Sequence, residues 1–319
     1  MVNKFVLSTT APQVKQNVYP AKIIDGNWGQ VVEISLLKTD LVLDYIVQLV
    51  EGTLEGGTSP AWTVSASNPA VLHIKVEQDN ETLFDMDAQV IQFLNGMFRN
   101  LNSNGLMWIV DAADVDARTK QSIVNTGWPT YLFSELKMYV TLPALSAITS
   151  GSPTGTSGSQ LLVVEEVVPR FAARFNSVMT KKVENSIAPA EIAGDNYFSD
   201  VMPKTGLYKY LGLFVSTTAP SNGYPAYTAG SDSAVSKVEI ELNSIYSPVK
   251  NYWSSLKQVD SSVYHQAPGS GFAIIPFMTD LNVTKMLNLS NPNAIKSAIL
   301  KITTTTAPVY ITEFYTLYR

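Results

Sequence analysis

The sequence predicts an all-β protein with two similar domains, and three observations support that prediction. Short runs of alternating or β-branched apolar residues, bounded by Gly, Pro and Asx turns, fill most of the chain. Helical periodicity of apolar residues is found only twice. A helix-like segment, a Gly-led apolar strand, an alternating strand and a β-branched strand follow one another before residue 170 and again before the C-terminus. Repetition on this scale indicates two copies of one architecture.

The repeat also predicts where the domains meet. The paired segments, first half before second half, are 90–97 with 249–256, 105–110 with 271–276, 136–138 with 300–302, and 164–167 with 311–314. The spacing between partners shrinks across the Gly-, Ser-, Thr- and Pro-rich stretch 146–160 by about the length of that stretch. We therefore predict that 146–160 is a loop inserted in the first domain only, between its last two strands. The first domain then spans 1–175 and the second 176–319.

Four segments of the first half carry the clearest strand signals. The β-branched runs 31–37 and 41–50 come first and are ended by several glycines and a proline. Residues 71–77 alternate between apolar and polar side chains. Residues 136–142 place Leu, Met, Val and Leu on one face and Lys, Tyr and Thr on the other, which predicts a half-buried strand.

One helix is expected in each half. Asp87 is the expected N-cap of a helix whose apolar stripe recurs through 90–101. In the second half, Ser247 is the expected N-cap and Pro248 the first helical residue. The buried stripe of that helix is expected at Val249, Tyr252, Trp253 and Leu256.

Composition excludes several classes of function. Only 15% of the residues are charged, against roughly 25% in ordinary soluble domains. Neutral surface suits permanent contact with neighbouring subunits, although a surface rich in Ser, Thr and Asn has the same composition. The net charge of −5 and the absence of Lys/Arg clusters argue against direct, sequence-specific binding of nucleic acid. The chain has no cysteine, no apolar run that spans a membrane and no signal peptide at its N-terminus.

Signatures of catalysis are absent from the sequence. There is no Walker loop, Rossmann fingerprint or nucleophile elbow, so we expect no catalytic residue and no cofactor. His73 and His265 lie in different halves and are expected in a strand and a turn. Asp111, Asp114 and Asp116 are weak metal candidates, because close carboxylates suit calcium. Their spacing matches no EF-hand, and a solvated loop at a strand end is the preferred interpretation.

Two further groups have both a structural and a functional interpretation. Glu165 and Glu166 are a carboxylate pair, but neighbours on a strand face opposite sides, so we expect one exposed and one interface carboxylate. Trp28 and Trp62 flank turns and stay open candidates for stacking on sugars. The buried core is the expected place of Trp108 and Trp253.

The region 247–319 resembles a known family. A helix that contains Tyr252-Trp253 precedes the strand 271–276, and a Thr-rich strand over 300–306 turns at Ala307-Pro308 into the last strand, 309–315. This order resembles the double jelly-roll major capsid proteins of tailless icosahedral viruses. That lineage includes adenovirus hexon and phages with an internal membrane. The resemblance implies a small lipid-containing bacterial phage as the source, such as the one that infects Flavobacterium. The first half carries the same order more weakly, and the resemblance fades before residue 30.

The resemblance implies two consecutive eight-stranded jelly rolls, each with a short helix before its last strands, and no enzymatic activity. It implies homotrimeric, pseudo-hexagonal capsomers that tile an icosahedral virion and assemble in the host cytoplasm. Expected partners are other copies of the chain, vertex (penton) and minor capsid proteins, and an internal membrane on the N-terminal side. The loop 146–160 would decorate the outside of the shell or clasp a neighbouring subunit.

Two other functions remain open at the level of sequence. The first is a carbohydrate- or receptor-binding β-sandwich, such as a viral spike or a lectin-like protein, which needs exposed aromatic side chains on one concave face. The second is a glycosidase-like β protein, which needs convergent carboxylates in a deep pocket.

Overall fold

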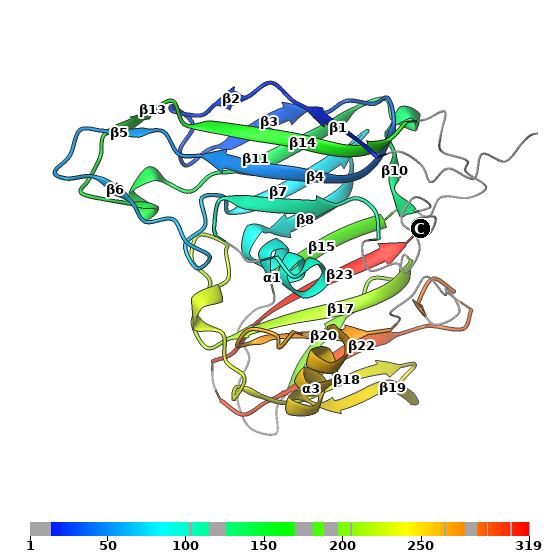
Figure 1. Cartoon of the computed structure of the whole chain (residues 1–319). Coiled ribbons are helices and arrows are strands. Elements are labelled where there is room, and N and C mark those ends of the chain that lie inside the picture. The colour runs from blue at the N-terminus through cyan, green and yellow to red at the C-terminus, as the bar shows by residue number, and fades with distance from the viewer. Residues whose placement is uncertain are drawn as a thin grey trace, which may run out of the picture.

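The structure of the chain, a computed structural model, has two β-sandwiches that lie side by side (Figure 1). Its description covers residues 14–101, 104–114, 126–169, 181–187, 197–204, 206–264, 266–277, 286–291, 293–306 and 308–318. Within 181–187 and 197–200, only the backbone is described.

The first sandwich has two four-stranded sheets at its centre. The first sheet has the order β1 (Lys15–Val18), β14 (Gln160–Val168), β4 (Leu41–Val50) and β9 (Met107–Asp111). The second sheet has the order β3 (Val31–Ser35), β11 (Leu136–Thr141), β7 (His73–Gln78) and β8 (Glu81–Asp87). The short strands β2 (Lys22–Ile23) and β10 (Trp128–Pro129) add to the first sheet beside β14 and β4.

The second sandwich is built in the same way. One sheet has the order β15 (Lys181–Ile187), β23 (Tyr310–Tyr318), β17 (Leu207–Ser216) and β20 (Phe272–Pro276), with β21 (Leu287–Asn288) beside β17. The other sheet has the order β16 (Tyr197–Val201), β22 (Ala298–Thr304), β18 (Val235–Leu242) and β19 (Tyr246–Tyr252).

The two sandwiches therefore share one topology. When the eight long strands of each half are counted in chain order, one sheet contains the first, eighth, third and sixth strands. The other sheet contains the second, seventh, fourth and fifth strands in both halves. Two sheets of eight antiparallel strands linked in this way are a jelly roll. The predicted all-β fold with two eight-stranded jelly rolls is confirmed.

Strands β8 and β15 join the two jelly rolls. They pair in parallel, with Val183 opposite Phe84 and Glu184 opposite Asp85. One sheet of each roll thereby becomes part of a continuous nine-stranded sheet. Backbone hydrogen bonds across the junction hold the rolls in one orientation, which a flexible linker alone would not do. The predicted boundary at residue 175 lies outside the described residues and stays a prediction.

The stretch 146–160 connects β11 to β14, the last two long strands of the first roll. Within it, β12 (Thr149–Ser150) pairs with β6 (Ala61–Trp62), and β13 (Gly155–Ser157) pairs with β5 (Thr53–Glu55). These ladders project from one end of the first roll (Figure 1). Short 3₁₀ turns lie at Leu145–Ala147, Thr130–Leu132 and Tyr227–Ala229.

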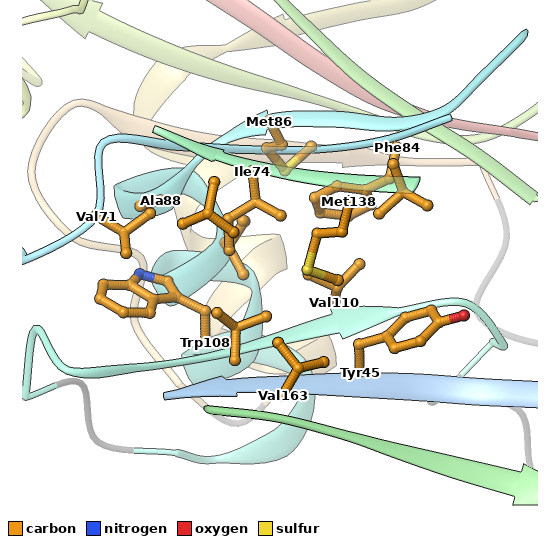
Figure 2. Close-up of a cluster of buried hydrophobic side chains, with 14 of the residues drawn as sticks. Tyr45, Val71, Ile74, Phe84, Met86, Ala88, Trp108, Val110, Met138 and Val163 are labelled. Atoms are coloured by element: carbon orange, nitrogen blue, oxygen red, sulfur yellow. The ribbon is translucent and has the colours of Figure 1, made fainter. Parts of the chain in front are cut away.

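Alternating side chains of the first roll fill the space between its sheets. Figure 2 shows Tyr45, Trp108 and Val163 on one side of this core, facing Ile74 and Met86 on the other. On β11, Leu136, Met138 and Val140 are buried, as the alternation predicted. The second roll has its own apolar cluster, which includes Leu213, Ile240, Ile275, Leu300 and Ile311.

In each roll, a described helix lies between the fifth and sixth long strands, but the predicted caps need correction. Helix α1 (Ala88–Arg99) begins after Asp87, whose carboxylate makes no capping bond because it binds other side chains. Helix α3 (Trp253–Tyr264) begins five residues later than predicted. Ser247 and Pro248 lie in β19 instead, an edge strand, where a proline removes no hydrogen bond from the ladder. Tyr252 is exposed rather than buried.

Neither helix has the length and hydropathy needed to cross a bilayer, and the described residues contain no other candidate span.

Gly212 tests the packing between the rolls. A Cβ atom at this position would lie 1.8 Å from Cε2 of Phe314, a ring that packs between the two halves. Gly212→Ala should lower the free energy of unfolding by about 1–3 kcal/mol, because the ring must leave its place. Urea unfolding followed by tryptophan fluorescence measures the change. Gly26→Ala is the matched control, because no atom lies within 4 Å of the added Cβ. Equal midpoints for the two variants would contradict the packing described.

Candidate functional site

Helix α1 of the first roll packs against the second roll. The ring of Phe93 stacks on Phe272 with centroids 4.3 Å apart and meets the edge of Phe314 at 6.0 Å. The ring of Phe98 lies 5.5 Å from Tyr210 and 5.1 Å from Tyr264 of helix α3. Each such aromatic pair contributes about 0.5–1.5 kcal/mol beyond the area that it buries. We call this contact the seam between the two rolls.

In the second roll's first sheet, β17 and β23 are buried on both faces. Every residue of β17 after Leu207 is buried, and so is every residue of β23 after Tyr310. By contrast, β22 alternates between buried and half-buried residues, because only one of its faces is covered. Continuous burial of this kind is typical of sheets that are covered on both sides. The residues that face the seam include Tyr210, Phe214, Phe272, Ile274 and Phe314.

A polar network crosses the seam beside α1. His73 Nδ1 lies 2.8 Å from Asp87 and Nε2 lies 2.5 Å from Asp85. The second oxygen of Asp87 accepts a hydrogen bond of 2.6 Å from the hydroxyl of Tyr227 in the second roll. Burial disfavours the charged imidazole, but hydrogen bonds and charges from both aspartates outweigh it and raise the pKa of His73 to about 9. The histidine is therefore a structural cation in a half-buried strand.

A buried ion pair also crosses the seam, just after the end of β9. Asp114 follows β9 and pairs with the ammonium of Lys209 on β17. The hydroxyl of Tyr318 on β23 donates a bond of 2.8 Å to the other carboxylate oxygen. Asp114 and Lys209 are 2% and 3% exposed, so neither charge is solvated. A buried charge needs its partner, and this pair therefore fixes the relative position of the two rolls.

Two of the three aspartates of the weak metal prediction are described, and each binds a different cation. Asp111 accepts a bond of 2.9 Å from Nε of Arg99, which also binds Asp44 at 2.7 Å. Asp114 pairs with Lys209, and Asp116 lies outside the described residues. In the part of the chain that the structure describes, no three His, Asp or Glu side chains lie close enough to hold a metal ion. The two described aspartates serve the packing of α1 and the seam.

The carboxylate pair on β14 is divided between two environments. Glu165 is buried and accepts bonds of 2.7 Å from Asn17 and Tyr19. Burial raises the pKa of Glu165, while these two hydrogen bonds lower it. Glu166 is half-exposed and binds Gln16 on β1. The pair therefore connects the N-terminal segment to β14. His265 lies outside the described residues.

The tryptophans are used in packing. Trp108 and Trp253 are buried, as predicted. Trp28 and Trp62 lie against each other with ring centroids 5.6 Å apart. Their indole N–H groups donate to Thr156 and to the carbonyl of Gly52, so they support the projecting ladders of β5, β6, β12 and β13. Phe93 and Phe98 were not singled out from the sequence, although their position outside the apolar stripe of α1 was a signal of a second packing face.

A surface cavity of about 380 Å³ opens on the seam. Among the described residues, its wall carries amides, hydroxyls and apolar groups but no carboxylate, imidazole, ammonium, guanidinium or thiol. Such a wall supplies shape and hydrogen bonds and no strong acid or base. Its lining residues are Ala66, Ser67, Gln89, Gln92, Phe93, Gly96, Met97, Leu101, Tyr227, Thr228, Gln266, Ala267, Gly269 and Phe272.

Surfaces equivalent to the two sides of the seam recur elsewhere on the chain, where no described element covers them. Helix α3 exposes Val259 and Val263, whereas helix α1 is buried on nearly all sides. The outer face of the first roll's first sheet carries half-buried Ile46, Met107 and Val164. In the register of the sheets, Ile46 pairs with Ile109 as Gly212 pairs with Ile274. The exposed face of α3 and the outer face of the first roll's first sheet are thus equivalent to the helix face and the sheet face that meet at the seam.

Solved structures of similar shape are viral capsid proteins. The major capsid protein of STIV, Sulfolobus turreted icosahedral virus, matches with a TM-score of 0.72 and 14% identity over 96% of each chain. The major capsid protein P2 of bacteriophage PM2 matches with a TM-score of 0.65 and 12% identity over 96% of this chain and 98% of that one. The PBCV-1 virus capsid protein gives 0.64 and 13% over 96% and 94%. The chain has the double jelly-roll fold. No protein-family model and no curated protein sequence matches this double jelly-roll chain.

The network at His73 should make the stability of the double jelly roll depend on pH. A pKa raised to about 9 means that the charged histidine stabilises the fold fully below pH ~6.5, the value in an unfolded chain. This contribution is lost as the pH rises from about 6.5 to 9. The difference in unfolding free energy between wild type and His73→Gln should therefore shrink over that interval. Denaturant unfolding at pH 6, 7.5 and 9 measures it, with Gln30→Ala at an exposed turn as the control. A constant difference would refute the network's role.

Proposed function

We propose that the chain is the major capsid protein of an icosahedral virion and that three copies form a pseudo-hexagonal capsomer. The observation that carries this proposal is the fold, in which two jelly rolls of equal topology are fixed side by side by β8 and β15. Capsid proteins of three viruses share this architecture over nearly their whole length. Two equivalent rolls in each of three copies supply six similar units around one axis.

The seam inside the chain is a model for the contact between copies. Asn95 of α1 and Asp260 of α3 occupy equivalent places, since each side chain binds the backbone of a residue fourteen positions ahead. Counted from these two residues, Val263 of α3 corresponds to Phe98 of α1. Phe98 packs against the second roll, whereas Val263 is exposed. We expect the free face of α3 to pack on another copy, as α1 packs within the chain.

The complementary surface lies on the first roll. On the outer face of β14, β4 and β9, the apolar residues Ile46, Met107 and Val164 correspond in register to Gly212, Phe272 and Phe314 of the seam. The polar residues Asp44 and Gln48 stand at the positions of Tyr210 and Phe214. Apolar side chains that no described element covers on a sheet face favour an interaction site. The two surfaces lie on different rolls, so contact between them is head-to-tail. Contacts of this kind close into a ring when the rotation between copies is suitable.

The edge strands support the same arrangement. Strand β1 ends the sheet of the first roll, and β19 ends a sheet of the second roll. Exposed apolar residues lie on both, with Val18 on β1 and Tyr246 and Tyr252 on β19. Within the chain, the strands equivalent to β19 and β1 are β8 and β15, which pair in parallel. Unprotected edges favour pairing with another chain, so β19 of one copy is expected beside β1 of the next.

Wider assignments rest on the resemblance in sequence. We propose vertex and minor capsid proteins as further partners, an internal membrane on the N-terminal side, and assembly in the host cytoplasm. A lipid-containing phage, such as the one that infects Flavobacterium, is the kind of source that we propose. We also propose that the chain is not an enzyme, in keeping with the capsid proteins that it resembles in structure.

A charge on the free face of α3 should prevent assembly. The wild-type chain should have a mass three times its 34.8 kDa in light scattering after size exclusion. Val263→Glu should shift the mass to that of one chain, because a carboxylate would be buried in an apolar contact. The melting temperature measured at a concentration at which both proteins are monomeric should stay the same, since Val263 is 36% exposed in the single chain.

Leu132→Glu is the control for this experiment. Leu132 is 68% exposed in a 3₁₀ turn that belongs neither to α3 nor to the four strands of the sheet face, so the variant should assemble as wild type does. Negative-stain images of the wild type should show particles with six-fold appearance. A wild-type chain that stays monomeric at every concentration, or a Val263→Glu variant that still forms trimers, would overturn the proposed capsomer.

A further inference from the structure

Each helix is hydrogen-bonded to the strand that follows it. The side chains that make these bonds stand at equivalent positions in the two helices but differ in chemistry. Asn95 of α1 makes two bonds with Ile109 of β9: its Nδ2 donates to the carbonyl at 3.0 Å, and its Oδ1 accepts from the N–H at 2.9 Å. Asp260 of α3 has the same relation to Ile274 of β20, and its Oδ2 accepts from the N–H at 2.8 Å. Asp260 is thus the repeat partner of Asn95.

The second oxygen of Asp260 makes no hydrogen bond. Asp260 is fully buried, with 0% of its surface exposed, and its Oδ1 has no partner within the described residues. At the equivalent place, Asn95 presents an N–H donor to a backbone carbonyl. An ionised carboxylate has only acceptors and cannot make that second bond. A buried charge with an unsatisfied oxygen also carries a large desolvation cost.

We infer that Asp260 is a buried proton-binding site. The protonated carboxyl makes two hydrogen bonds that hold α3 to β20, as the amide of Asn95 holds α1 to β9. The Oδ1–H group then donates to the carbonyl of Ile274, and both oxygens are satisfied. When the proton leaves, one of the two bonds is lost and a negative charge stays in the core. The hydrogen bonds between α3 and β20 in the second roll are therefore sensitive to pH, and those between α1 and β9 in the first roll are not.

The charged groups that the structure describes around α3 leave Asp260 without a close counter-ion. Lys257, on the same helix, attracts the carboxylate, but its ammonium binds both oxygens of Asp232 at 2.7 and 2.8 Å. Strand β20 has no titratable side chain. On β18 and β19, the charged residues Lys237, Glu239, Glu241 and Lys250 lie on the half-buried or exposed faces, where Glu239 pairs with Lys237 and Lys250 and Glu241 pairs with Lys301.

Burial therefore dominates, and it raises the pKa of Asp260 to about 7, against the opposing effects of the Ile274 N–H and Lys257. In an unfolded chain the same carboxyl titrates near pH ~4. Between these values the folded chain binds more protons than the unfolded chain does, so its stability falls as the pH rises. The loss is complete above about pH 7. This direction is opposite to that of an aspartate held in a salt bridge.

Asp260→Asn tests the inference, because asparagine supplies the missing donor at every pH. The variant should melt several degrees higher than wild type at pH 8, and the difference should nearly vanish at pH 4.5. Asp232→Asn is the matched control. Asp232 is held ionised by Lys257, Trp253 and the N–H of Gly271, so its substitution should lower the melting temperature at pH 8. A lower melting temperature for Asp260→Asn at pH 8 would refute the proton site.

Hydrogen exchange in the wild-type chain gives a second readout that needs no variant. Peptides that cover 272–276 and 107–111 report, in one sample, on β20 and β9, the strands to which Asp260 and Asn95 bind. After correction for intrinsic exchange rates, protection of 272–276 should fall relative to 107–111 between pH 5 and pH 8. A ratio that does not change with pH would overturn the inference. This result is independent of whether the chain forms trimers.

Discussion

The packing of helix α1 on the outer face of the second roll's sheet is the constraint on which the rest of the structure depends. Phe93 and Phe98 turn a sheet that would otherwise face solvent into a layer that is buried on both sides. Gly212 has no side chain, which leaves room for the ring of Phe314 in that layer. The ion pair of Asp114 with Lys209 and the half-buried network of His73 then set the orientation, and at the ion pair no water can replace a lost partner.

The sequence predicted the parts of the fold in which local pattern and environment agree. The strand 136–141 alternates because one of its faces is solvated, and 41–50 was recognised from its β-branched residues. The strand 207–216 was not singled out, because burial on both faces removes the alternation and Gly212 interrupts it. Ser247 and Pro248 are a sound local signal for a helix start, yet edge pairing with β18 places them in a strand. Local propensity is weaker than tertiary context at such positions.

The candidate site was less predictable than the fold. Phe93, Phe98 and Lys209 acquire their roles only when the second half of the chain is in contact with them. The aspartates 111 and 114 looked like neighbours in sequence, but each faces a cation from a different element. The relation between Asn95 and Asp260 is present in the sequence as a repeated spacing, although its meaning requires the hydrogen bonds to Ile109 and Ile274. The two positions share the same placement on helix and strand, but one carries an amide and the other a carboxyl group.

The pairing of β1 with β14 has a consequence for biosynthesis. Residues 15–18 are among the first of the described chain to leave the ribosome, but their partners, 164–167, are made about 150 residues later. Until then, β1 and one edge of β4 have no partner, and the outer edge of β8 waits longer still for β15. Contacts of such high sequence separation form slowly, and open edges recruit other nascent chains on the same polysome. The growing polypeptide is therefore most prone to aggregate before β14 emerges, which is the stage at which a chaperone would have the greatest effect on yield.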